Sequence, residues 1–365
     1  MALLPVLDTA ESRGHATCTA CPSLCRSSCP VARAEARESV QPQRLMVQAG
    51  LLKSGALSPV GLGDAPFHCT DCGACEAACG LGVEAPLHLQ LARGRVMAGG
   101  EGPSAAAEIA GGFGVAGNPF GESLESVLEA PADALGLGIR RKAEIVYHPG
   151  CVTLRHVPDA VASVLVAMSR GSLPELRLTS VSGQCCGAPL AWAGDLEGFA
   201  SHAARFARAL EGCRSLIVQD AGCARTLRHL YPQVGVSAPV EIRSLTELIP
   251  PEPIRSSALF VPCQLRRQPG LRTGETALGH GGAGEPRVDE GTLSNACCGA
   301  GALLPETVPE VAAAMGGEIL EAFRATSAST WYVASSRCVA HLRRVDPSAP
   351  VLEVAGRLEA REDSR

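Results

Sequence analysis

The sequence predicts an α+β protein, in which a small helical, cysteine-rich domain is followed by a duplicated α/β domain. Residues 1–98 hold two dense runs of cysteine joined by apolar residues at helical spacing, whereas residues 141–357 alternate short apolar runs with helical patterns. In that second region one set of cysteines recurs at the same spacing, which indicates an internal repeat. We expect domains at residues 1–98, 141–250 and 251–357, a linker at 99–140 and a tail at 358–365.

Two cysteine runs near the N-terminus have the spacing by which a polypeptide holds two iron–sulfur cubes. They read Cys18-x2-Cys21-x3-Cys25-x3-Cys29-Pro30 and Cys69-x2-Cys72-x2-Cys75-x3-Cys79. The first run has one extra residue between Cys21 and Cys25, and Gly80 stands where the second run would usually have proline. In two-cluster bacterial ferredoxins the last cysteine of each run ligates the cluster of the other run. We therefore expect two [4Fe–4S] clusters, ligated by Cys18, Cys21, Cys25 and Cys79, and by Cys69, Cys72, Cys75 and Cys29.

A disulfide framework and structural zinc are the two other uses of such cysteines. Disulfide frameworks belong to small secreted domains. This chain has 365 residues, and its first residues, which include Asp8 and Glu11, lack the basic and apolar regions of a secretion signal. A zinc site uses four ligands, fewer than two runs of four supply. We therefore favour iron–sulfur clusters over zinc and expect the protein to lie in the reducing cytoplasm.

The composition argues against nucleic-acid binding and against a membrane span. The formal net charge is −5 and aromatic residues make up 3% of the chain, so we expect neither a basic stripe nor base-stacking platforms. A transmembrane helix needs about eighteen or more apolar residues. The longest candidate, residues 157–168, is interrupted by Pro158, Asp159 and Ser163. Any association with a membrane is therefore expected to run through a partner.

Helices are expected around the two cysteine runs. Apolar residues recur at helical spacing in 31–39 and 43–54, and 85–98 forms a third helical pattern. Residues 99–138 are rich in glycine, alanine and acidic side chains, and 122–129 is the one helical candidate among them. We expect this segment to be a linker that wraps over the neighbouring domain.

The second region contains one cysteine pattern twice. In each copy a lone cysteine is followed by 33 residues, then by a Cys-Cys-Gly triplet, and later by a fourth cysteine. The cysteines are Cys151, Cys185, Cys186 and Cys223 in the first copy, and Cys263, Cys297, Cys298 and Cys338 in the second.

Each lone cysteine of this repeat follows an apolar strand candidate. These candidates are 145–147, 216–218, 259–261 and 331–334, and helical patterns follow the Cys-Cys pairs at 199–210 and 309–323. Strands that alternate with helices predict parallel sheets, and ligands of such sheets bind at the carboxyl ends of the strands. The copies differ between these elements: 160–168 is a helical pattern in the first, whereas 268–289 is rich in glycine and charge. We expect a flexible or shortened element there.

This order of modules resembles a family of iron–sulfur proteins with paired Cys-Cys-Gly domains. The family includes heterodisulfide reductase catalytic subunits and the iron–sulfur subunits of anaerobic glycerol-3-phosphate, glycolate and lactate dehydrogenases. The resemblance covers nearly the whole chain. It implies an iron–sulfur electron-transfer subunit of an oxidoreductase, with a flavoprotein dehydrogenase as partner and a quinone or another carrier as acceptor. In the heterodisulfide reductase branch each such domain ends in Cys-x2-Cys and holds a non-cubane cluster, whereas Thr226 and His341 stand at the last position here.

Four cysteines per copy remain sufficient in number for a further cluster in one or both copies. Cys185, Cys186, Cys297 and Cys298 are the candidate catalytic residues of such a site. Thr226 carries no soft donor, whereas imidazole ligates iron in Rieske centres, so His341 is a candidate ligand and a helix-face residue is its other interpretation. The cysteines could instead pack as small apolar residues. A reversible Cys185–Cys186 disulfide is a strained third alternative.

Four other residues are not expected to bind a cluster directly. Cys213 has no counterpart in the second copy and is interpreted as structural. His148 is interpreted as a loop histidine, with a hydrogen bond that tunes a nearby cluster as the alternative. Asp71 and Glu76 are expected to be solvated surface charges, with partner docking as their alternative.

Three functions are compatible with this sequence. The first is a relay, in which two [4Fe–4S] clusters carry electrons between a flavoprotein partner and the Cys-Cys-Gly domains. No Gly-x-Gly-x2-Gly stretch follows a strand and opens a helix, so we expect no flavin or NAD bound by the chain itself. The second is an enzyme that reduces a disulfide at a Cys-Cys-Gly cluster, and the third is a redox sensor or scaffold that carries zinc or clusters. We favour a component of an oxidoreductase complex over a complete enzyme.

Overall fold

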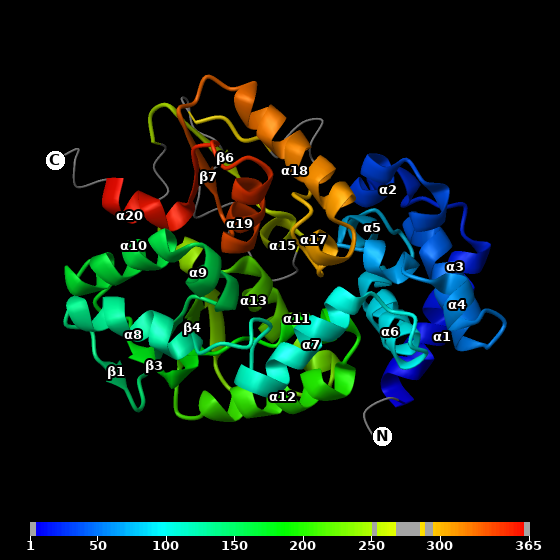
Figure 1. Cartoon of the computed structure of the whole chain (residues 1–365), viewed down its shortest axis with the longest axis horizontal. Coiled ribbons are helices and arrows are strands. Elements are labelled where there is room, and N and C mark those ends of the chain that lie inside the picture. The colour runs from blue at the N-terminus through cyan, green and yellow to red at the C-terminus, as the bar shows by residue number, and fades with distance from the viewer. Residues whose placement is uncertain (1–4, 250–253, 268–284, 289–294, 361–365) are drawn as a thin grey trace.

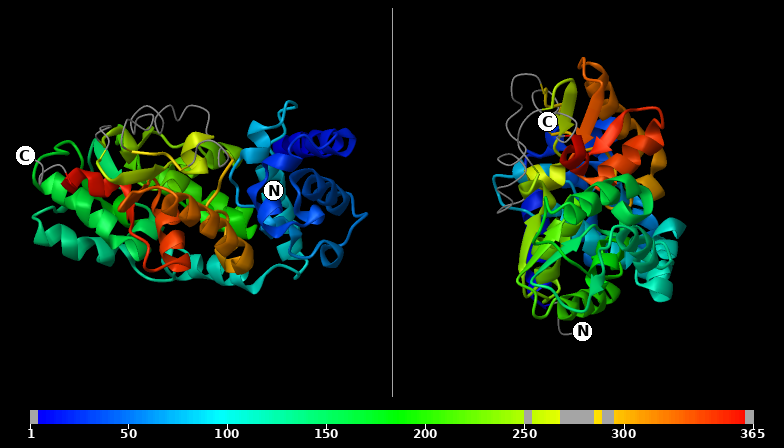
Figure 2. Two further views of the ribbon diagram at one scale, coloured as in Figure 1. Left: turned by 90° about the horizontal axis from the view of Figure 1, so that it is seen from above. Right: turned by 90° about the vertical axis from the view of Figure 1, so that its left-hand side faces the viewer.

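The computed structural model describes residues 5–249, 254–267, 285–288 and 295–360. It is an α+β protein, as the sequence predicts, with small parallel sheets among many more helical residues. The helical N-terminal module lies at one end of an elongated molecule, beside the two copies of the repeat (Figure 1). Figure 2 shows the same arrangement from above. In the described part of the chain, no helix has both the length and the hydropathy that a membrane crossing requires.

Short helices build the N-terminal module around the two cysteine runs. They are α1 (Pro5–Ala20), α2 (Pro30–Glu35), α3 (Pro42–Lys53), α4 (Pro59–Leu62), α5 (Ala74–Ala77) and α6 (Ala85–Ala98). Proline stands in the first turn of α2, α3, α4 and α6, where its missing N–H costs no hydrogen bond. Leu45 and Ala49 of α3 share a buried core with Leu89 and Ala92 of α6. The helices expected from the sequence are confirmed, although the first ends early, at Glu35.

The first copy of the repeat is a three-stranded parallel sheet with its helices. Its strands are β2 (Ile145–His148), β4 (Ser215–Val218) and β5 (Glu241–Ser244), in the order β2-β4-β5. Every residue of β2 and β4 is buried, which explains their nearly continuous apolar sequences. The helices are α9 (Cys151–His156), α10 (Pro158–Ser169), α11 (Ala188–Ala193), α12 (Leu196–Ala209), α13 (Ala221–Arg225) and α14 (Tyr231–Gln233), with a π-helical turn, Thr226–Leu230, between the last two.

The second copy repeats this topology. Its strands β6 (Ser257–Phe260), β7 (Thr330–Val333) and β8 (Val351–Glu353) form a parallel sheet in the order β6-β7-β8. The helices are α15 (Cys263–Arg266), α17 (Leu304–Thr307), α18 (Pro309–Arg324), α19 (Ser336–Val345) and α20 (Arg357–Ala360). The internal repeat and its four strand candidates are therefore confirmed. The element expected at 268–289 lies almost entirely outside the described residues.

The segment between the module and the repeat is folded against the first copy. It forms α7 (Ser104–Ala116), α8 (Leu124–Ala134) and β1 (Ile139–Arg140). Leu124, Leu128 and Ala132, which share one face of α8, are buried in the core of the first copy. Strand β1 pairs in parallel with β3 (Leu178–Thr179). Residues 99–140 therefore run along the first copy instead of bridging open solvent.

Helix α6 joins the N-terminal module to both copies. Arg93 is 1% exposed, and its guanidinium donates hydrogen bonds to four backbone carbonyls. The acceptors are Pro66 (3.1 Å), Trp192 (2.8 Å), Ala302 (3.1 Å) and Cys69 (2.7 Å). The next residue, Gly94, passes so close to Gly194 that a Cβ at Gly94 would lie 2.9 Å from the Gly194 carbonyl oxygen. This joint holds the cysteine runs against the repeat.

Candidate functional site

The first group of predicted ligands converges on one apolar pocket. Its members, called set 1, are Cys18, Cys21, Cys25 and Cys79. Cys18 lies in the last turn of α1, Cys25 precedes a short 3₁₀ helix, and Cys79 follows α5. Burial and the three other thiols of the set raise the pKa of Cys18 to about 11. Met46 and Val83 contribute apolar side chains to the pocket.

The second group converges on a neighbouring pocket. Its members, called set 2, are Cys69, Cys72, Cys75 and Cys29. Cys29 comes from the first cysteine run, and burial followed by the proximity of Cys72 raises its pKa to about 12. The pKa of Cys75 is raised by burial and then by neighbours that include the three other thiols. The structure therefore brings together the crossed sets that the ferredoxin spacing predicts.

Sets 1 and 2 fit four-iron clusters in their donor chemistry. Each brings four soft sulfur donors into one largely apolar pocket, where burial and the neighbouring thiols raise the pKa of Cys18, Cys29 and Cys75. Bound iron would supply the positive charge that stabilises the thiolates. Over the residues that the structure describes, no three His, Cys, Asp or Glu side chains are arranged to hold a single metal ion.

The cysteines of the first copy meet at the carboxyl ends of β2 and β4, where the sequence places them. They are Cys151, Cys185, Cys186 and Cys223, called the copy 1 thiols, and each is at most 1% exposed. Cys151 Sγ lies 3.3 Å from Cys185 Sγ. Hydrogen bonds with Cys185 and Cys223 lower the pKa of Cys186 well below its usual value. This convergence favours a shared ligand over separate packing roles.

The second copy brings its own four cysteines together in the same way. They are Cys263, Cys297, Cys298 and Cys338, called the copy 2 thiols. Cys263 Sγ lies 3.8 Å from Cys297 Sγ, and Cys298 Sγ lies 2.8 Å from Cys338 Sγ. Hydrogen bonds with Cys297 and Cys338 lower the pKa of Cys298. His341 follows Cys338 by one turn of α19 and is 4% exposed.

Set 2 and the copy 2 thiols touch through Cys72 and Cys297. A hydrogen bond between these two side chains is the main cause that lowers the pKa of Cys72 to about 6. Thr70 Oγ1 lies 3.7 Å from Cys297 Sγ, and Arg267 donates to the carbonyl of Cys72 at 3.1 Å. The sequence does not predict this contact, because no local pattern relates two cysteines from different domains.

The expectation that Asp71 is a solvated surface charge is wrong. Its side chain is buried, and Oδ2 accepts hydrogen bonds from Trp192 Nε1 (3.1 Å) and Arg225 Nη1 (2.5 Å). Burial raises the pKa of Asp71, whereas the charge of Arg225 lowers it. Glu76 is partly buried, and its pKa is raised to about 7, chiefly by burial. Asp71 therefore anchors the second cysteine run to the first copy.

Arg337 and Asp220 connect the two copies of the repeat. Asp220 Oδ2 accepts hydrogen bonds from Ser335 Oγ (3.1 Å) and the backbone N–H of Arg337 (3.0 Å). The Arg337 guanidinium lies over the ring of Trp192, 4.7 Å from its centroid, and its charge acts on Cys151 of the first copy. A residue of the second copy therefore helps to form the environment of the copy 1 thiols.

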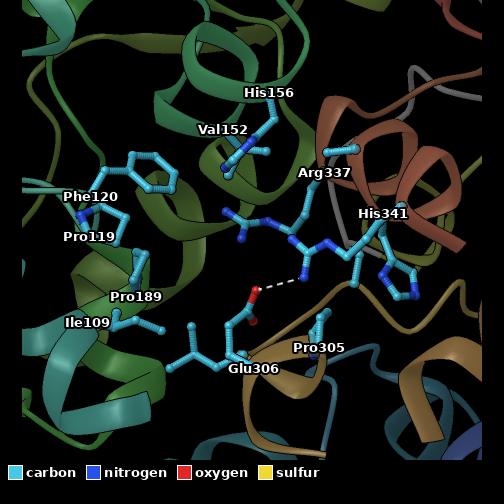
Figure 3. A pocket seen from close by; sticks show the side chains of 14 residues that line it. Ile109, Pro119, Phe120, Val152, His156, Pro189, Pro305, Glu306, Arg337 and His341 are labelled. Carbon is cyan, nitrogen blue, oxygen red and sulfur yellow. Dashed lines mark ion pairs between the residues drawn. The ribbon is translucent and has the colours of Figure 1, made fainter. Parts of the chain in front are cut away.

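A pocket of about 220 Å³ opens between the two copies (Figure 3). Phe120 and Pro189 belong to its apolar lining. Two arginines, Arg337 and Arg344, and two imidazoles, those of His156 and His341, also line it. Glu306 forms an ion pair with Arg344 at 3.6 Å. The pocket can therefore accept a small molecule that is part apolar and part anionic.

Two further predicted residues, His148 and Cys213, belong to the first copy, and His148 acts electrostatically on Cys186 of the copy 1 thiols. His148 is the last residue of β2 and is fully buried, so it is not a loop histidine. Its Nδ1 donates to the carbonyl of Val181 at 3.1 Å. Cys213 lies in the turn before β4, partly buried, and burial raises its pKa.

Comparison with known proteins agrees with this division of the chain. Residues 14–83 match the family described as "4Fe-4S dicluster domain", and residues 145–228 and 257–343 each match "Cysteine-rich domain". The chain is 25% identical to a subunit of the fumarate reductase (CoM/CoB) of Methanothermobacter marburgensis, over 92% of this chain and 68% of the relative. It is 26% identical to a subunit of the dihydromethanophenazine:CoB–CoM heterodisulfide reductase of Methanosarcina barkeri, over 68% of this chain and 65% of the relative.

The matched domains, one dicluster domain followed by two cysteine-rich domains, stand in the order that the family resemblance implies. The chain spans about two thirds of the length of each relative. Both relatives are subunits of larger reductases by name. The chain belongs to the iron–sulfur proteins that join a 4Fe-4S dicluster domain to two cysteine-rich domains.

Proposed function

We propose that this subunit carries single electrons from a flavoprotein dehydrogenase partner, through two [4Fe–4S] clusters, to the cysteine-rich domains and on to a quinone or another carrier. Set 1 would hold the first cluster and set 2 the second. The contact between Cys72 and Cys297 carries the proposal, because Cys72 is a member of set 2 and Cys297 is one of the copy 2 thiols. The names of the two relatives support a complex of the heterodisulfide or fumarate reductase type.

The surface around set 1 supports entry of electrons at that end. Leu24 and Leu81 line the set 1 pocket and are 56% and 57% exposed. Exposed large apolar side chains that lie close together mark contact sites for other proteins. A partner that covers Leu24 and Leu81 would bring its own redox group close to set 1.

Two arginines shape the environment of set 2. A [4Fe–4S] cluster supplies reversible one-electron storage, and nearby charges and hydrogen bonds adjust its potential. The charge of Arg93 acts on Cys69, and that of Arg267 acts on Cys72. Positive charge stabilises the added electron. Both side chains therefore favour the reduced form of a cluster held by set 2, next to the copy 2 thiols.

The substitution Cys75→Ala tests the relay. We expect it to remove the set 2 cluster, which lowers the iron content by about four per chain. Set 1 and the copy 2 thiols stay in place, so a reduced flavoprotein donor should still reduce set 1 while centres in the cysteine-rich domains stay oxidised. Freeze-quench EPR spectroscopy measures the reduction of set 1 and the oxidation state of the centres in the cysteine-rich domains. Cys213→Ala, which removes a cysteine outside every set, is the control, and transfer at the wild-type rate in Cys75→Ala would exclude the relay through set 2.

Reduction of a disulfide or a similar two-electron substrate is the second candidate, and the pocket between the copies favours it. Arg337 lines this pocket and acts on the copy 1 thiols, while His341 lines it beside the copy 2 thiols. We expect a new EPR signal when a thiol product is added to the oxidised protein. About eight irons per chain, as two [4Fe–4S] clusters contain, with cubane signals alone would exclude this activity.

A further inference from the structure

Helix α19 presents a thiol and an imidazole on the same face. Cys338 and His341 are three residues apart, a spacing that makes helical side chains neighbours. Helical side chains lean toward the N-terminus of their helix, so the ring of His341 leans over the turn that holds Cys338. With 4% of its surface exposed, His341 belongs to the interior and not to the solvated side of the helix.

The hydrogen bond of His341 determines which ring nitrogen is free. Nε2 lies 2.9 Å from the carbonyl oxygen of Ala312 on α18. A carbonyl only accepts, so Nε2 carries the proton and the neutral ring has its lone pair on Nδ1. Nδ1 is buried and has no hydrogen-bond partner among the described residues. Histidines that bind metals are held in this way, with one nitrogen bonded to a carbonyl and the other directed at the metal.

The copy 2 thiols are the groups with which this nitrogen could bind iron. Hydrogen bonds with Cys297 and Cys338 lower the pKa of Cys298, and the ring of His341 interacts electrostatically with the same thiol. The imidazole and these thiols therefore share one buried site. Four thiols and one imidazole nitrogen give this site five soft or intermediate donors.

The first copy offers no such donor at the matching position. Thr226 follows Cys223 as His341 follows Cys338, but its hydroxyl donates to the carbonyl of Gly222 at 2.7 Å. The hydroxyl is used within its own helix, and an alcohol oxygen is a poor ligand for an iron–sulfur centre. The two copies thus differ in chemistry although they share a topology.

We propose that His341 Nδ1 is an iron ligand of a cluster held by the copy 2 thiols, and that Thr226, at the matching position of the first copy, supplies no ligand. The inference rests on the proposed role of the copy 2 thiols as a cluster site. Imidazole carries no negative charge, and nitrogen ligands raise the potential of Rieske centres above that of all-thiolate clusters. Copy 2 would therefore retain electrons that arrive from set 2 through Cys72 and Cys297.

Pulsed EPR spectroscopy on the whole chain, purified anaerobically after growth with ¹⁵N-histidine, tests this ligand. We expect a strong nitrogen coupling that changes with the isotope. It should be lost in His341→Thr, which introduces the residue type that the first copy has at this position. It should also be lost in His341→Cys, which keeps the iron and lowers the potential of the centre. His148→Phe, which copies the second copy's Phe260, is the matched control and should retain the coupling.

The possible outcomes separate this inference from the relay. More than eight irons per chain, with a nitrogen coupling that persists in both His341 variants, would overturn the ligand assignment and leave the copy 2 cluster standing. More than eight irons per wild-type chain, without any nitrogen coupling from histidine, would also overturn the ligand assignment and leave the copy 2 cluster standing. About eight irons in the wild-type chain, with only set 1 and set 2 signals, would overturn the copy 2 cluster itself and the ligand with it.

Discussion

Replacing Arg93 with leucine is expected to lower the free energy of unfolding by about 4 kcal/mol, because four backbone carbonyls, three of them in buried residues, lose their donor at once. The guanidinium also lies 5.0 Å from the centroid of the Phe67 ring, so the substitution removes a cation–π contact as well. Leucine fills part of the space but donates no hydrogen bond. The N-terminal module should then dock poorly on both copies.

Denaturant unfolding of the anaerobically purified protein measures this loss. Arg33→Leu is the matched control, since Arg33 also joins the module to the repeat, through an exposed ion pair with Glu318 at 2.8 Å. Exposed ion pairs contribute about 1 kcal/mol or less. Equal losses in the two variants would show that the buried hydrogen bonds of Arg93 do not hold the module in place.

The substitution Glu353→Gln is expected to stabilise the protein at pH 8. Burial raises the pKa of Glu353 from 4.5 to about 8, although Ala355 N–H and Gln219 Nε2 both donate to Oε2. At a pH between these two values, the Glu353 carboxyl loses its proton in the unfolded chain and keeps it in the folded chain. Stability therefore falls as the pH rises from 4.5 to 8, by roughly 4–5 kcal/mol in all. Glutamine accepts the same hydrogen bonds and does not titrate.

The difference in unfolding free energy between the variant and the wild type, followed from pH 5.5 to pH 8.5, measures this effect. We expect the advantage of Glu353→Gln to grow steadily with pH. Glu359→Gln on α20 changes an exposed carboxyl and should show no such trend. A difference that stays constant with pH would mean that Glu353 is already ionised in the folded protein.

The sequence predicts best the strands and helices whose residue pattern lies within one short stretch of the chain. The strand candidates at 145–147 and 331–334 lie within a residue of β2 and β7, because a buried parallel strand is a short apolar run. The helix at 85–98 is placed at its true bounds, since apolar periodicity and a first-turn proline agree. The segment at 99–138 gave a weaker signal, because glycine-rich α7 becomes helical by packing on the first copy.

The sequence predicts only those parts of the candidate site whose pattern is local. Sets 1 and 2 follow from spacing, since a cluster takes most of its ligands from one short loop. Asp71 was placed wrongly, because an acidic residue in a loop is usually exposed and its partners Trp192 and Arg225 lie far along the chain. The sequence is compatible with two roles for His341, an iron ligand and a helix-face residue. The tautomer that the Ala312 carbonyl imposes is visible only after α18 packs on α19.

The sequence by itself determined which cysteines can act together, because ligand spacing and the internal repeat are encoded along the chain. Only the tertiary structure decided how these groups connect. Set 2 meets the second copy through Cys72 and Cys297, while Asp71 and Trp192 tie it to the first. Such contacts depend on the docking of whole domains, and buried side chains such as Arg93 hold that docking with partners that no local pattern identifies.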